Sequence, residues 1–256
     1  MRRYAIVVAT CTALLFVTGP AVSGNEARPL YTLGQCHIWL GAVVGVLTAG
    51  LAVWLWRLKE RAWLQRLVWV ALGVNIIEGL LGLVPEPIPA SVRISHSLLG
   101  QLFFSATVAL VLFVSKDSGP RAADNSRLLN FVAMTTPALV LSQVALGVAF
   151  RHGIVGMAPH VVWAFVVALW FILVIAATRN AKQIEVRRAG VAFTVVASVQ
   201  IFLGFALFLM QAVDADPIFL IVTTIVHATT AAFTLAASVA MSILILRTRW
   251  NAPMLA

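Results

Sequence analysis

The sixth apolar stretch of the chain reads PHVVWAFVVALWFILVIAAT over residues 159–178. It contains no charged side chain, and it is long enough for a helix that crosses a hydrocarbon core of about 30 Å. Stretches of similar length and composition recur near residues 4–22, 33–56, 67–84, 95–115, 128–150, 189–213 and 217–246. Helices are expected because backbone polar groups cannot stay unpaired in lipid, and none of the stretches alternates like a barrel strand. The sequence therefore predicts an all-α polytopic membrane protein with eight transmembrane helices.

The composition agrees with this prediction. The 256 residues are 61% hydrophobic and 11% charged, and their mean hydropathy is +0.99. A soluble domain is about 45–50% apolar and about 25% charged, so we expect a lipid bilayer to cover much of this surface. The net charge of +9 lies in short runs between apolar stretches. This pattern is a topology signal and does not indicate a nucleic-acid partner.

The basic residues predict the orientation. Fifteen of the 18 Lys and Arg residues flank the stretches on one side, and only Arg28, Arg93 and Arg151 fall on the other. This bias predicts a multi-pass protein of the inner (plasma) membrane with both termini in the cytoplasm. A cleaved signal peptide is the alternative for the first stretch, because Arg2 and Arg3 precede it and small residues follow at 21–24. Cleavage would leave seven helices, whereas the repeat described below favours retention.

Four of the five histidines fall in alternate stretches, the second, fourth, sixth and eighth: His37, His96, His160 and His227. These four stretches run from outside to inside, and the first three histidines come within a few residues of the outer end. His227 is about ten residues into its stretch, unless part of 214–226 is interfacial. A single membrane histidine is often only packed, but four on one side of the bilayer indicate function. His152 is expected in a loop.

A small residue follows each of these histidines by four positions, at Gly41, Gly100, Ala164 and Ala231. In a helix these positions share the histidine's face, one turn deeper. They leave room for a flat macrocycle, although small residues also serve bare helix packing. We therefore predict two heme sites with paired histidine ligands, His37 with His96 and His160 with His227. Such ligation suits an electron-transferring heme.

Other metal chemistry fits less well. Zinc usually takes three or four converging ligands at spacings that are missing here. Cys36 and His37 resemble the end of a covalent heme motif, but Leu33 stands where its first cysteine is required.

Three further charged residues are candidates. Arg93 and Arg151 lie on the outer side and are suited to pairing with heme propionates, or else they anchor helices at the interface. Glu78 is the acid inside an apolar span, with Asn75 nearby. It is a candidate for moving protons or guiding substrate, or else a hydrogen-bonded structural residue.

The two halves of the chain resemble each other. Residues 75–82 (NIIEGLLG) in the third stretch are similar to residues 199–204 (VQIFLG) in the seventh. We predict two pseudo-symmetric four-helix bundles, residues 1–116 with a substrate or second heme site and residues 128–256 with a heme b site. A cytoplasmic linker, 117–127, would join them.

In these features the chain resembles the heme A synthase family. The resemblance covers all eight stretches and rests on Gln143-x3-Gly147, Gln200-x3-Gly204, residues 151–153 (RHG) and the histidine of each even stretch. It implies an eight-helix pseudo-twofold fold in which His160 and His227 hold heme b. It also implies that the site of His37 and His96 receives heme O, whose methyl group is oxidised to the formyl of heme A for terminal oxidases.

The chain departs from the family pattern in the second helix, which usually carries Glu-x-x-His-Arg. Gly34 stands at the glutamate position and Ile38 at the arginine position, Val161 replaces an arginine that often follows the sixth-helix histidine, and Cys11 is no counterpart of the outer cysteine pair. The heme scaffold therefore carries over better than the reaction. Glu78 is our candidate for the missing carboxylate, which would make His37, His96 and Glu78 the catalytic group.

Two other functions stay open. A b-type diheme cytochrome would pass electrons between quinone and a partner respiratory complex, and the missing glutamate favours it. A transporter is less favoured, because the halves repeat in parallel and no span is broken at its middle. As a heme A synthase the protein would meet a heme O-producing enzyme or a terminal oxidase complex.

Overall fold

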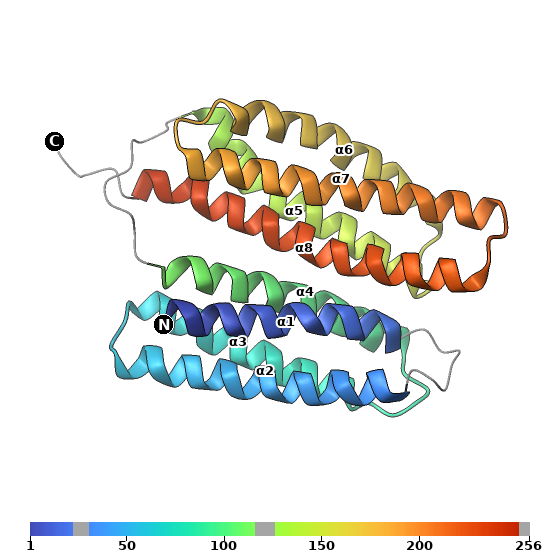
Figure 1. The fold of residues 1–256 in the computed structure, drawn as a ribbon, viewed down its shortest axis with the longest axis horizontal. Coiled ribbons are helices and arrows are strands. Elements are labelled where there is room, and N and C mark those ends of the chain that lie inside the picture. Colours follow the sequence, from blue (N-terminus) through green and yellow to red (C-terminus); the bar gives the residue numbers. More distant parts are fainter. Residues whose placement is uncertain (23–30, 116–125, 251–256) are drawn as a thin grey trace. The chain divides into compact units, whose positions relative to one another are not determined.

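The structure, a computed structural model, describes residues 1–22, 31–115 and 126–250; of residues 21–22, 31–33 and 248–250 it describes only the backbone. These residues form helices and no strand (Figure 1). The helices are α1 (Arg2–Val22), α2 (Tyr31–Arg57), α3 (Ala62–Gly82), α4 (Ala90–Phe113), α5 (Arg127–Arg151), α6 (Met157–Arg179), α7 (Ile184–Ala212) and α8 (Pro217–Trp250).

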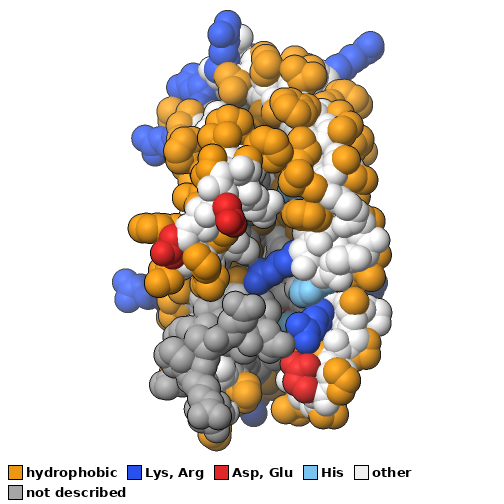
Figure 2. Space-filling model, turned by 90° about the vertical axis from the view of Figure 1, so that its right-hand side faces the viewer, with side chains coloured by type: hydrophobic (Ala, Val, Ile, Leu, Met, Phe, Trp, Pro, Cys, Tyr) orange, Lys and Arg blue, Asp and Glu red, His pale blue; other side chains and the backbone are white. Residues whose placement is uncertain are grey.

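Within this described part of the chain, eight helices are long and apolar enough to cross a membrane. Their outer surfaces are apolar: Val46, Leu169 and Trp39 are each about two-thirds exposed or more. Figure 2 looks onto one end of the helices, where Lys, Arg, Asp and Glu side chains lie among the hydrophobic ones. The apolar outer surfaces of the helices need lipid around them, so the protein is a multi-pass membrane protein. The prediction of an all-α protein with eight spanning helices is confirmed.

The chain divides into two compact units. The first comprises Met1–Ser115 and Leu203–Ala232. In it α1 packs against α2 and α4, and α3 packs against α2 and α4, so these four helices close a ring. Its core is filled by Val44, Leu51, Leu55, Leu64, Val68, Phe103 and Leu110, all nearly inaccessible to solvent.

The described part of 116–202 and 233–256 forms the second unit. Here α5 and α6 pack together, and indole donors of α6 join them: Trp170 Nε1 donates to Thr136 Oγ1 (3.0 Å) and Trp163 Nε1 to Ser142 Oγ (2.8 Å). Each bond satisfies a polar group that lipid would leave unpaired.

Most boundaries agree with the predicted spans to within a few residues. The largest differences are the starts of α3, α4 and α7, each five residues earlier than predicted. The longest helix is α8, whose 34 residues give a length of about 51 Å, well beyond a hydrocarbon core of about 30 Å. His227 is ten residues from the start of α8. If the first turns of α8 project beyond the hydrocarbon core, His227 lies near the outer face of the bilayer, as the other three histidines are predicted to do. Most of the predicted linker 117–127 lies outside the described residues. So do residues 23 and 24, at the end of the alternative signal-peptide exit. The division into two pseudo-symmetric halves stays a prediction.

Candidate functional site

His37 and His96 lie together in the first unit, although 59 residues separate them in the sequence. His37 comes six residues after the start of α2, and His96 comes six residues after the start of α4. Their ring centroids are 6.3 Å apart with an angle of 75° between the planes. Metal–nitrogen bonds of about 2.0 Å on opposite sides of one ion put two imidazole centroids on the order of 6 Å apart. The pair thus has the separation that a shared metal ion requires.

Glu78 of α3 reaches this pair from a third helix. Its Oε2 lies 3.0 Å from Nδ1 of His96, and its side chain is 13% exposed. Its other oxygen, Oε1, is buried and has no hydrogen-bond partner among the described residues. A carboxylate with one oxygen at a histidine and the other free is placed to hold or transfer a proton there.

Thr18 of α1 completes the group from the fourth helix. Its Oγ1 lies 3.0 Å from Nδ1 of His37. The neighbouring Gly19 lies against the same ring, because a Cβ atom at Gly19 would be 3.0 Å from His37 Cε1. The four helices of the ring therefore each contribute a residue to one polar cluster: Thr18, His37, Glu78 and His96.

His160 has a similar setting in the second unit. The side-chain amide of Gln143 lies 3.1 Å from Nδ1 of His160 and donates to the backbone carbonyl of the same residue at 3.2 Å. A Cβ atom at Gly147 would be 2.8 Å from His160 Cε1. Phe150 stacks on the ring, with 6.4 Å between centroids and 14° between planes. These contacts fix the ring between α5 and α6.

The same glycine contact recurs in all four helical hairpins. The glycine lies on the first helix and touches Cε1 of the histidine on the second, in four pairs: Gly19 with His37, Gly82 with His96, Gly147 with His160 and Gly204 with His227. A Cβ atom would be 2.8–3.1 Å from the ring at Gly19, Gly147 and Gly204, so a side chain there would displace the imidazole, whereas the 3.8 Å at Gly82 is an ordinary contact. This explains the Glu/Gln-x3-Gly spacing of the sequence, since Glu78 and Gln143 lie one turn before their glycine and bind the ring.

Sequence reasoning missed Thr18 and Gly19 as site residues. The first hairpin has Leu15 where the others have Glu or Gln, so the repeated spacing gives no signal there. Gln143 was visible only as part of a motif, without a role.

The small residues that follow the histidines have different surroundings. Gly41 has open space where a Cβ atom would be, as a bound macrocycle would need. A Cβ atom at Gly100 would be 3.2 Å from Glu78 Oε2, so the carboxylate lies over that position. Ala164 and Ala231 are both partly buried.

The arginines lie at helix ends. Arg93 Nη2 pairs with Glu86 Oε2 at 3.2 Å, and Arg93 Nε donates to the carbonyl of Ile88 at 3.3 Å. Its guanidinium keeps further donors for a ligand carboxylate. Arg151 is the last residue of α5 and is exposed, and His152 is the C-cap residue of that helix.

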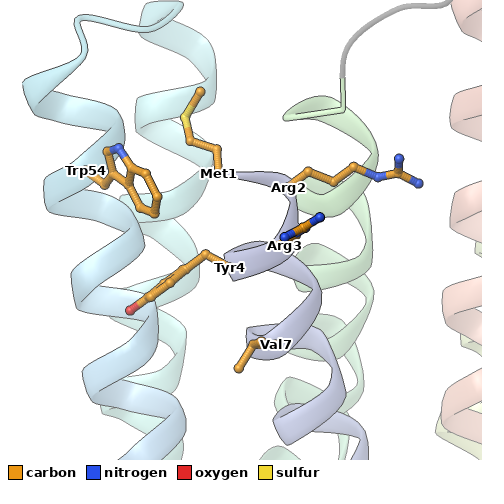
Figure 3. A pocket seen from close by; sticks show the side chains of 6 residues that line it. All are labelled: Met1, Arg2, Arg3, Tyr4, Val7 and Trp54. Carbon is orange, nitrogen blue, oxygen red and sulfur yellow. The ribbon is translucent and has the colours of Figure 1, made fainter.

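An open pocket lies at the other end of α1, lined by Met1, Arg2, Arg3, Tyr4, Val7 and Trp54 (Figure 3). It contains no histidine and is far from Thr18 along the helix. It plays no part in the histidine site.

Among residues 1–22, 31–115 and 126–250, no three histidine, cysteine or acidic side chains converge as a site for a bare metal ion. The chemistry of the donor set is that of paired imidazoles, which fits axial ligation of heme. Comparison with known protein families and with curated proteins gives no match. The functional argument therefore rests on the residues and their geometry.

Proposed function

We propose that this protein is a heme-binding membrane oxidoreductase of the heme A synthase type. The observation that carries the proposal is the pair His37 and His96, held 6.3 Å apart inside a ring of four apolar helices with Glu78 beside them. Ionisable groups are costly in a bilayer, so three of them together argue for a bound group that uses them.

The proposed roles in the first unit follow from the contacts. His37 and His96 would hold and orient the substrate heme O between α2 and α4. Glu78 would hold a proton at Oε2, next to His96 Nδ1, in the place of the carboxylate that Gly34 lacks. The apolar helices around Glu78, whose side chain is 13% exposed, would keep water away from its carboxylate. The bound heme supplies the redox chemistry, for which this protein provides ligands, orientation and a dry site.

The sequence supports a second heme, heme b, with His160 and His227 as its ligands. The structure describes each histidine within its own unit: His160 has a polar partner, Gln143, and a glycine against its ring, and His227 has Gly204 against its ring. These local settings support a role for each histidine as an axial ligand. Arg93 and Arg151 are the proposed partners of heme propionates at the two sites.

We further infer that the protein lies in the plasma membrane with both termini in the cytoplasm. Fifteen of the 18 Lys and Arg residues support this orientation, and it puts the histidine ends of the even helices near the outer face.

A non-hydroxylating diheme b cytochrome is the second candidate. The similar setting of His37 and His160 favours it, since two equivalent sites suit two permanently bound hemes that pass electrons between quinone and a respiratory complex.

Extraction and chromatography of the hemes tests both candidates, using protein purified from a host that supplies heme O. Heme A together with heme b would establish the synthase. Two hemes b per chain and no heme A would establish the cytochrome, and a protein without heme would refute both.

A further inference from the structure

We propose that Thr18 is a positioning residue for His37: its hydroxyl accepts a hydrogen bond from Nδ1–H, which fixes the ring as one tautomer and leaves Nε2 as the ligand atom. The proposal about the tautomer concerns only residues of this chain. Its consequence for ligation rests on the heme-binding function proposed above.

The direction of the hydrogen bond follows from the other contacts of Thr18. Its Oγ1 lies 3.3 Å from the carbonyl oxygen of Leu15 and 3.4 Å from that of Leu14, in donor geometry to both. A hydroxyl has one hydrogen, and the two carbonyls can only accept. We assign the hydrogen to these carbonyls, so that the oxygen accepts from the ring nitrogen 3.0 Å away. His37 then carries its proton on Nδ1.

A flipped ring would not compensate for the loss of this hydrogen bond. Rotating the ring by half a turn about its Cβ–Cγ bond would put a carbon opposite Thr18 and leave the hydroxyl oxygen without its donor. Gly19 makes room for the ring, since a Cβ atom there would be 3.0 Å from His37 Cε1. The threonine thus selects one ring orientation as well as one tautomer.

The hairpin of α3 and α4 supports the assignment. Oε2 of Glu78 lies 3.0 Å from Nδ1 of His96, where a carboxylate oxygen accepts from Nδ1–H. Thr18 lies at the same ring atom of His37, also from the preceding helix, but with a shorter side chain. Metal-binding histidines usually have their second ring nitrogen bound in this way, which fixes the tautomer.

The test is 15N-histidine NMR of the full-length protein, prepared without heme in lipid nanodiscs at a pH where the ring is neutral. The His37 signals are assigned by comparison with His37→Ala. Thr18→Val removes the hydroxyl and keeps the side-chain shape, and Thr18→Ser restores the hydroxyl. Thr12→Val is the matched control, because Thr12 is a buried threonine of the same helix whose hydroxyl donates only to Val8 O (2.8 Å).

We expect His37 to be in the Nδ1–H form in the wild type, in Thr18→Ser and in Thr12→Val, and a loss of this preference in Thr18→Val. Heme-loaded Thr18→Val should also bind heme about 10- to 100-fold more weakly, as is usual when such a partner is removed, with rescue by Thr18→Ser. An unchanged His37 tautomer in Thr18→Val, or an equal change in Thr12→Val, would overturn the proposal. If the tautomer responds as expected but the wild type binds no heme, the heme function fails and the positioning role stands.

Discussion

Glu78 Oε2 and His96 Nδ1 lie 3.0 Å apart, across the contact between α3 and α4. The two residues are 18 positions apart in the sequence, and the hairpin brings them to the same level of the helix pair. The carboxylate of Glu78 therefore contacts Nδ1, which leaves Nε2 of His96 available to bind a metal. This contact joins Glu78 to the pair of histidines and makes that residue the first target for mutation.

Glu78→Gln should keep heme binding and lower the rate of heme A formation. The amide preserves the size of the side chain and a polar contact to His96, but it cannot accept or release a proton. Removal of a general acid or base typically costs about 10²- to 10⁴-fold in rate. The measurement is the yield of heme A per bound heme in a host that supplies heme O.

Asp214→Asn is the control for that experiment, since Asp214 is an exposed acid in the turn between α7 and α8. It should form heme A at the wild-type rate. Normal heme A formation by Glu78→Gln would show that Glu78 is only structural.

Gly147→Ala should destabilise the protein and weaken its hold on heme. The new Cβ atom would be 2.8 Å from His160 Cε1, so the ring or the helix must shift. Overpacking of this kind costs about 1–3 kcal/mol. Thermal unfolding in detergent and the heme retained after purification would measure the effect.

Gly79→Ala is the matched variant, because nothing lies within 4 Å of a Cβ atom at this position. Alanine is a better helix former than glycine, so the variant should be at least as stable as the wild type. If both glycine variants behaved alike, the contact with the histidine would not be the reason for the glycine.

Arg93→Gln should weaken heme binding without unfolding the protein. Its ion pair with Glu86 is partly exposed, and such pairs contribute about 0–1 kcal/mol. A bond from arginine to a propionate is worth more, about 1.5–3 kcal/mol, which corresponds to a loss of roughly 10- to 100-fold in affinity. Heme titration of the heme-free protein measures this, and unchanged affinity would make Arg93 an interfacial anchor only.

Reporter fusions should reveal both termini in the cytoplasm. A reporter after Lys59 or Asn180 should also be cytoplasmic, and one after Pro85 or Gly153 should be outside. These positions lie in turns between helices, where insertions are tolerated best. The opposite pattern would put the histidine ends of the even helices on the cytoplasmic side and contradict the proposed orientation.

The spans could be predicted from the sequence because each depends only on the local length and polarity of a stretch. The start of α6, for example, differs from its prediction by two residues. The partners of the histidines could not be predicted in this way. The contact of Thr18 with His37 depends on the rotation and axial offset of α1 against α2, and apolar residues all around a helix leave both undetermined.

The glycines illustrate the same limit. The sequence drew attention to Gly41 and Gly100, which follow histidines on their own helices. The glycines that touch the rings instead lie on the preceding helices, such as Gly19 and Gly147. A helix period relates residues within one helix, whereas these contacts are made between two.

The central claim is that His37 and His96 bind heme, and the optical spectrum of purified protein with its heme content per chain tests it most directly. His37→Ala and His96→Ala should each lose one heme per chain or convert it from low spin to high spin. His152→Ala is the matched control and should give the wild-type spectrum, because His152 is the C-cap residue of α5 and is not one of the four proposed ligands. Wild-type spectra and heme content in both His37→Ala and His96→Ala would contradict the account.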